Sequence, residues 1–264
     1  MSHSSRDAGT GDRAVKGWRR RAFRAASAVL VITALWATAT QLLGNRIVPY
    51  PWAVFERFLA LLPDPLLTHM LASLARVTAA LAVSFAVALP LGVAMGRIKA
   101  FDWLLSPASY LMFPVPKIAL LPVVLLVFGL GNVAKVFLVT LVLFFQILTA
   151  VRDGARNIDR RYLLSFRSLG GSRLQSVRYV ILPALLPNLF TALRVGSGTA
   201  LAVLFFAETF FTRFGLGYMI MDAWTRVAYL DMYVGILGLS LLGLALFAAI
   251  DLAERLLCPW ARRD

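Results

Sequence analysis

The side chains that most often carry out chemistry are few in this sequence and lie far apart. Among 264 residues there are two histidines, His3 and His69, and one cysteine, Cys258. A Ser-His-Asp arrangement or a zinc centre needs several such residues together, and one cysteine cannot form an internal disulfide. The sequence also contains no Gly-x-x-x-x-Gly-Lys-Ser/Thr loop for binding ATP phosphates. We therefore predict no catalytic site, no metal site and no cofactor.

Ionisable residues inside apolar segments are the remaining candidates for function, because charges at membrane depth usually face protein or water. Lys117 follows Pro114 and Pro116, which should interrupt a helix. A cation beside an interrupted helix is suited to line an anion pathway, although we favour the alternative that Lys117 pairs with a carboxylate or reaches a lipid headgroup. Glu208 stands nearly alone in its apolar segment and has either a gating role or a structural pairing with an arginine, which we favour.

Three other ionisable residues are expected to have ordinary roles. Arg76 and Arg194 lie near the ends of apolar segments, where long side chains extend toward water. His69 is expected at the membrane interface. The candidate pathway residues are therefore Pro114, Pro116, Lys117 and Glu208.

The elements that position these residues are long apolar blocks. The chain is 60% hydrophobic, with a mean hydropathy of +0.77, and several blocks reach the ~18 residues that a helix needs to cross a bilayer. Leu, Val, Ala and Phe blocks favour an all-α membrane protein over a barrel. We predict about six spans, near residues 25–43, 70–96, 104–128, 133–151, 184–210 and 232–252. Residues 44–67 are predicted to form a short interfacial helix.

Basic residues determine the predicted orientation. The net charge is +14; seven Lys and Arg precede Ala25, and seven more lie between Arg152 and Arg178. Such clusters collect on the cytoplasmic side, so we expect both termini in the cytoplasm and no role in binding nucleic acid. Residues 1–24 are predicted to be a disordered basic tail near anionic lipid, and 25–264 the membrane domain. A signal peptide is the alternative interpretation of the first apolar block.

The segment 152–182 is too polar to cross the membrane, yet its apolar residues have helical spacing. Gly170 and Gly171 supply a turn in which a positive φ is allowed, and Ser172 is a plausible N-cap. We predict a helix, a glycine turn and a second helix on the cytoplasmic face, with a shape suited to insertion into a partner.

This segment resembles the EAA loop of permeases in ATP-binding cassette importers. The family pattern is Glu-Ala-Ala, three residues, Gly, nine residues and Ile-x-Leu-Pro. Gly170, Leu182 and Pro183 match it, whereas Leu164, Ser165 and Phe166 replace Glu-Ala-Ala. Further likenesses to nitrate, sulfonate and taurine permeases occur in order over about residues 66–252: "SLARV", "LPLGVAMGR", "FPVPKIALLPVVLLVFGLGNVAK" and "AETFFTRFGLGYMI".

The resemblance implies a bacterial inner-membrane subunit that forms the pathway for a small anion. It also implies a second copy of the permease, two separate ATP-binding subunits and an extracytoplasmic solute-binding protein as partners. The ATPase-coupling residues would be Phe166, Arg167, Ser168, Leu169, Gly170, Gly171, Ser172 and Pro183.

Two other classes of protein are weighed against this interpretation. A secondary transporter driven by an ion gradient should carry several intramembrane carboxylates and often an internal repeat, and neither is evident. A membrane-embedded enzyme should carry clustered His, Asp or Cys residues at the membrane surface, and these are missing.

Overall fold

The computed structural model describes residues 8–261, and of residues 8–22, 24, 25 and 261 only the backbone. This part of the chain contains helices and no strands, which confirms the predicted all-α class. Helices suit the bilayer because they satisfy their backbone hydrogen bonds internally. The long helices are α1 (Ala8–Leu43), α3 (Leu67–Arg97), α6 (Asn132–Arg156), α9 (Leu182–Thr209) and α11 (Tyr229–Leu257).

Shorter helices connect the long ones. They are α2 (Pro51–Leu61), α4 (Lys99–Met112), α5 (Leu121–Phe128), α7 (Arg160–Ser168), α8 (Arg173–Ser176) and α10 (Leu216–Thr225). Short 3-10 or π-helical turns cover Leu62–Leu66, Lys117–Leu120, Val177–Ile181 and Pro259–Ala261. In the described residues five helical segments are long and apolar enough to cross a membrane, and α4 with α5, bent by 84°, forms a broken sixth candidate. The predicted break at "FPVPK" is therefore present.

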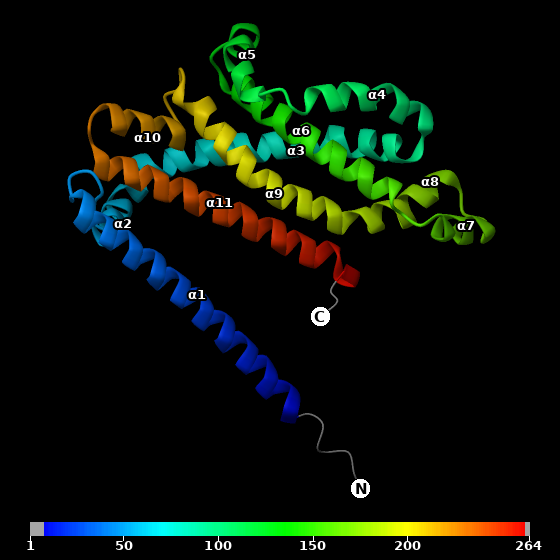
Figure 1. Cartoon of the computed structure of the whole chain (residues 1–264), viewed down its shortest axis with the longest axis horizontal. Coiled ribbons are helices and arrows are strands. Elements are labelled where there is room, and N and C mark those ends of the chain that lie inside the picture. The colour runs from blue at the N-terminus through cyan, green and yellow to red at the C-terminus, as the bar shows by residue number, and fades with distance from the viewer. Residues whose placement is uncertain (1–7, 262–264) are drawn as a thin grey trace.

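Helices α3, α6, α9 and α11 lie along one another and form the bundle (Figure 1). Contact is most extensive between α3 and α6, where small residues let the backbones approach. A Cβ on Gly96 would lie 2.6 Å from the Ala155 Cβ, and one on Gly92 would lie 2.8 Å from Val151. The end of the bundle that carries α7, α8 and the last turn of α3 is called the α7 end, and the opposite end, with α2 and α10, the α10 end (Figure 1).

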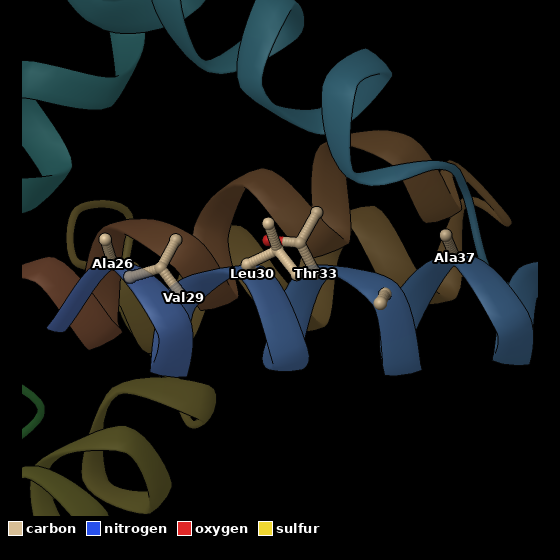
Figure 2. Close-up of a pocket in the computed structure, with 6 residues that line it drawn as sticks. Ala26, Val29, Leu30, Thr33 and Ala37 are labelled. Atoms are coloured by element: carbon tan, nitrogen blue, oxygen red, sulfur yellow. The ribbon is translucent and has the colours of Figure 1, made fainter. Parts of the chain in front are cut away.

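Helix α1 diverges from the bundle and meets it near its own C-terminus (Figure 1). The Trp36 Nε1 donates to the Pro49 carbonyl at 3.1 Å, and the Trp36 and Tyr233 rings lie 5.8 Å apart. Toward the N-terminus of α1, small and aliphatic side chains, among them Val29 and Leu30, line an open groove of 640 Å³ beside the helix (Figure 2).

Helix α1 begins before the first apolar block. It starts at Ala8, within the predicted basic tail of residues 1–24, whereas its segment that is long and apolar enough to cross a membrane is Ala26–Leu43. The remainder of the predicted tail, residues 1–7, lies outside the described part. Helix continuation is physically reasonable because residues 8–24 contain no proline and only three glycines, Gly9, Gly11 and Gly17.

The predicted interfacial helix corresponds to α2, which packs against α11 at the α10 end. The Arg57 Nε donates to the Asp231 Oδ1 at 2.8 Å and ties the two helices together. Val54 and Phe58, both residues of α2, are buried. Helix α2 thus closes one end of the bundle.

Candidate functional site

Helices α7 and α8 and the turn between them, residues 160–176, form a compact unit that we call the glycine-turn module. Asp159, just before the module, caps α7, since its side chain accepts a hydrogen bond from the Arg161 N–H at 2.8 Å. After α7 the chain reverses at Gly170, where φ is +87°, a conformation that glycine adopts without steric cost. A full capping box then starts α8: Ser172 Oγ accepts from the Gln175 N–H, and Gln175 Oε1 from the Ser172 N–H. The predicted helix, turn and N-cap are confirmed.

The two glycines of the turn have different structural roles. A Cβ on Gly170 would meet no atom within 4 Å, so its backbone angle alone favours glycine. A Cβ on Gly171 would lie 2.2 Å from the Phe166 ring, which packs directly on its backbone. Gly171 is therefore required for packing inside the module, whereas the space beside Gly170 is open.

The exposed surface of the glycine-turn module carries apolar side chains among its arginines and serines. Leu169 at the turn is 87% exposed and Leu164 is 57% exposed. An apolar groove of 570 Å³ lies between α7 and the start of α9, with Tyr162, Phe166 and Tyr179 among its walls. An exposed apolar surface outside the spans is typical of a protein contact. Pro183 lies apart from the turn, roughly 15 Å along the helix from Arg173 at 1.5 Å per residue.

The second set of predicted residues lies at the break between α4 and α5. Here the Lys117 Nζ donates to the carbonyls of Met112 at 2.8 Å and Phe113 at 2.9 Å. It also lies over the Phe113 and Phe145 rings, 5.6 and 5.3 Å from their centroids. Among the described residues Lys117 therefore pairs with no carboxylate, and carbonyls at the end of α4 accept its hydrogen bonds.

A second lysine also binds backbone carbonyls. The Lys135 Nζ donates to the Leu130 carbonyl, in the loop between α5 and α6, at 2.9 Å. Lys117, by contrast, satisfies carbonyls that a helix C-terminus leaves unpaired. A neutral carbonyl does not cancel the positive charge, and Lys117, which is half-buried, keeps that charge at the break.

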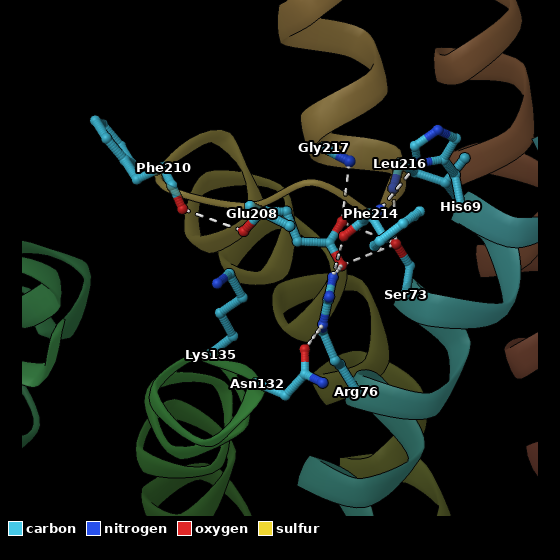
Figure 3. A network of polar contacts seen from close by, with 12 residues as sticks. His69, Ser73, Arg76, Asn132, Lys135, Glu208, Phe210, Phe214, Leu216 and Gly217 are labelled. Atoms are coloured by element: carbon cyan, nitrogen blue, oxygen red, sulfur yellow. Dashed lines mark hydrogen bonds and ion pairs between the residues drawn. The ribbon is translucent and has the colours of Figure 1, made fainter. Parts of the chain in front are cut away.

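Glu208 lies in a buried polar network at the α10 end (Figure 3). Its side chain is fully buried, and its Oε1 accepts from the Arg76 guanidinium at 2.6 Å. Ser73 Oγ and the Gly217 N–H also donate to the carboxylate, at 2.8 and 2.9 Å. The structural pairing expected for Glu208 is therefore present, and no hydrogen bond or ion pair joins it to Lys117 among the described residues.

The network fixes the loop that leads into α10. Arg76 donates to the Phe214 carbonyl at 2.7 Å, and the Gly215 N–H donates to the His69 Nδ1 at 3.0 Å. Gly215 has φ +138°, and a Cβ there would lie 2.5 Å from the Glu208 Cδ and 2.7 Å from the Arg76 guanidinium. The "FGLGY" motif thus contains glycine where the loop crosses the ion pair.

Sequence reasoning missed most of this network. His69 and Arg76 were expected at an interface, but they are only 8% and 7% exposed. Their signal was the spacing of His69, Ser73 and Arg76, four and three residues apart, which places all three on one helix face. An arginine on that face inside an apolar segment needs a carboxylate partner, and Glu208 was available.

Arg194 is corrected in the same way. Its Nε donates to Asp251 at 2.8 Å, and its guanidinium also pairs with Glu254. These contacts join α9 to α11 near the α7 end. Arg194 therefore holds two helices together, and it does not simply extend toward water.

Comparison with known proteins places these features in a family context. The sequence model of the family described as "Binding-protein-dependent transport system inner membrane component" matches residues 88–263. The chain is 31% identical to the taurine transport system permease protein of Escherichia coli (strain K12), over 88% of this chain and 86% of that protein. It is 33% identical to the putative aliphatic sulfonates transport permease protein of the same organism, over 87% and 88%.

The fold is also found in a solved structure. A chain of the MetNI methionine ABC transporter, in inward-facing conformations, superimposes with a TM-score of 0.60 at 21% identity. The match covers 73% of the present chain and 95% of the solved one. It supports the helical architecture described above.

Proposed function

Because the chain belongs to the family of binding-protein-dependent transport system inner membrane components, we propose that it forms the membrane pathway for a small anion and is driven by separate ATP-binding subunits. The observation that carries this proposal is the glycine-turn module. It presents an apolar surface at the end of the bundle, and the chain contains no phosphate-binding loop of its own. ATP hydrolysis must then occur on a partner.

The coupling contact is assigned to the turn and its neighbours: Phe166, Arg167, Ser168, Leu169, Gly170, Gly171 and Ser172, with Pro183 farther along the helix. A docked subunit would meet Leu169 and the groove between α7 and α9. Burial of exposed apolar area gives such a contact about 25 cal/mol per Å² of gross stabilisation. Leu164, which replaces the family glutamate, adds to this apolar area.

A continuous helix supports transmission of movement from this contact across the membrane. From Arg173 to Thr209 the chain is helical for 37 residues. Its first turn belongs to the glycine-turn module, and its last turn carries Glu208. A displacement of the module by the ATP-binding subunits would therefore reach the loop that Arg76 and Glu208 hold. We propose that this movement alternates the pathway between its inward-open and outward-open states.

The proposed substrate class is a sulfonate-like or nitrate-like anion. Relatives that the chain matches are permeases for taurine and aliphatic sulfonates. In this chain Lys117 supplies a positive charge beside Pro114 and Pro116 that no carboxylate of the described residues neutralises. That charge would attract an anion to the broken helix.

The proposed assembly contains two copies of this chain, two ATP-binding subunits and an extracytoplasmic binding protein. The α7 end would face the cytoplasm, since it carries the arginines of the segment 152–178. Both termini would then be cytoplasmic. A periplasmic location of a reporter fused after Asp264 would refute this orientation.

The proposal is tested by uptake into proteoliposomes that contain the permease and its co-purified partners. With binding protein present, radiolabelled taurine or another sulfonate should accumulate only when ATP reaches the ATP-binding subunits. Uptake driven by an ion gradient without ATP would favour the secondary transporter instead. Hydrolysis of ATP by the purified chain alone would also contradict the assignment.

A further inference from the structure

A second groove lies on the other side of the glycine-turn module. It has a volume of 360 Å³ and separates the last turn of α3 from α7 and α8. Its walls combine two kinds of side chain. Val93, Ala94, Leu163, Val177 and Ile181 are apolar, whereas Arg97, Arg167 and Arg173 bring three guanidinium groups. We call it the arginine groove.

The three arginines of this groove have no acidic partner among the described residues. Arg97 donates to the Ala155 carbonyl at 3.3 Å, which leaves its charge in place. Arg167 and Arg173 make no side-chain hydrogen bond or ion pair with the described residues. Arg152, Arg156 and Arg194, by contrast, all pair with carboxylates near the same end of the bundle.

Mutual repulsion favours an anion in the arginine groove. Three guanidinium groups line this one groove, so their positive charges repel one another. An anion among the three guanidinium groups would relieve this repulsion and form charge-assisted, bidentate hydrogen bonds. Phosphate is the group that such planar forks bind well.

The position of the groove identifies the source of the anion. Arg97 is the last residue of α3, a candidate membrane span, so the groove lies where the hydrocarbon region ends. Val93 and Ala94, one turn earlier, continue its wall toward the apolar part of the span. A lipid with a phosphate headgroup and an acyl chain fits a groove that is basic at one end and apolar at the other. Basic pockets between spans at the cytoplasmic side are known to bind lipid headgroups.

We propose that the arginine groove binds an anionic phospholipid of the adjacent leaflet. The phosphate lies among Arg97, Arg167 and Arg173, and the part of the acyl chain nearest the headgroup lies along Val93 and Ala94. The bound lipid braces the glycine-turn module against α3. An acidic side chain of an ATP-binding subunit is the other possible occupant, but a soluble partner has no use for the apolar wall on the membrane side.

The test counts bound lipids by native mass spectrometry on the permease purified with its ATP-binding partner. Phosphatidylglycerol and phosphatidylcholine are offered at equal concentration. The wild type should retain phosphatidylglycerol preferentially. The variant R97Q/R173Q should bind it about 25-fold more weakly, since each arginine near the surface contributes about fivefold. This pair leaves the proposed coupling residues unchanged.

A matched control removes the same charge elsewhere at the α7 end. R161Q/R178Q alters two arginines that do not line the groove, so its phosphatidylglycerol affinity should stay within about threefold of wild type. R97K/R173K keeps the charge but loses the planar fork, so it should still prefer phosphatidylglycerol, with lower affinity. Size-exclusion profiles confirm that each variant is folded.

Several results would overturn the proposal. One is equal retention of the two lipids by the wild type, and another is equal weakening in both glutamine pairs. Complete displacement of the lipid by excess inorganic phosphate would identify a free anion as the ligand. Loss of the ATP-binding subunit from R97Q/R173Q with unchanged lipid binding would assign the arginines to the protein partner.

Discussion

Neutralising Glu208 should destabilise the permease far more than neutralising a comparable carboxylate near the surface. The substitution Glu208→Gln keeps the side-chain shape but leaves the Arg76 charge buried without an opposite charge, since both side chains are almost fully buried. Breaking a buried pair from one side costs about 3–5 kcal/mol. The glutamine NH₂ would also face donors, because Ser73 and the Gly217 N–H both donate to the carboxylate.

The matched control is Asp231→Asn, which breaks the pair with Arg57. That arginine side chain is 42% exposed, so water replaces much of the interaction and the cost should be about 1 kcal/mol or less. The assay is the apparent melting temperature of each purified variant in one detergent. At about 2–4 °C per kcal/mol, Glu208→Gln should lower it by roughly 6–20 °C, and Asp231→Asn by less than about 4 °C.

A double variant tests whether the two buried charges act as a pair. Arg76→Met combined with Glu208→Gln removes both charges, so it should be less destabilised than the sum of the single variants. Recovery should be incomplete because Asn132 and the Phe214 carbonyl lose their donor. Additive losses, or equal shifts for Glu208→Gln and Asp231→Asn, would refute the buried-pair argument.

Three further predictions concern the turns and the helix break. Gly170→Asp should insert and fold, since the space beside it is open, but it should lose partner co-purification and uptake. Gly170→Asn, which tolerates the same φ without the charge, should lose less. Normal uptake by Gly170→Asp would contradict the coupling role. Gly215→Ala should lower the melting temperature, because its Cβ would overlap Glu208 and Arg76; an unchanged value would show that the loop is free to move. Lys117→Met should reduce anion uptake at least tenfold if the charge attracts the anion, while Lys117→Arg keeps most of it; equal uptake by both variants would leave Lys117 with a capping role alone.

Local features of the chain could be predicted from the sequence because they depend on neighbouring residues. The span positions follow from apolar length. The conformation at Gly170 and the cap at Ser172 follow from intrinsic preferences of glycine and serine. The helix break follows from Pro114 and Pro116, which lack backbone donors.

Long-range pairings could not be predicted in the same way. Arg76 and Glu208 are separated by more than a hundred residues, and only the packing of α3 against α9 brings them together. For Lys117 the sequence suggested pairing with a carboxylate, contact with a headgroup or a place in the pathway. Nothing in the sequence shows that the carbonyls ending α4 point toward its amine. The arginine groove likewise depends on how α3 meets α7, which no motif encodes.

The most direct test of the coupling assignment is photo-cross-linking from the glycine turn. A photoreactive amino acid at Leu169 should capture an ATP-binding subunit in the intact membrane, because this side chain is 87% exposed at the turn. The same probe at Phe211, 68% exposed near the α10 end, should not capture that subunit. Capture from Phe211 with none from Leu169 would contradict the account, since the partner would then dock at the opposite end of the bundle.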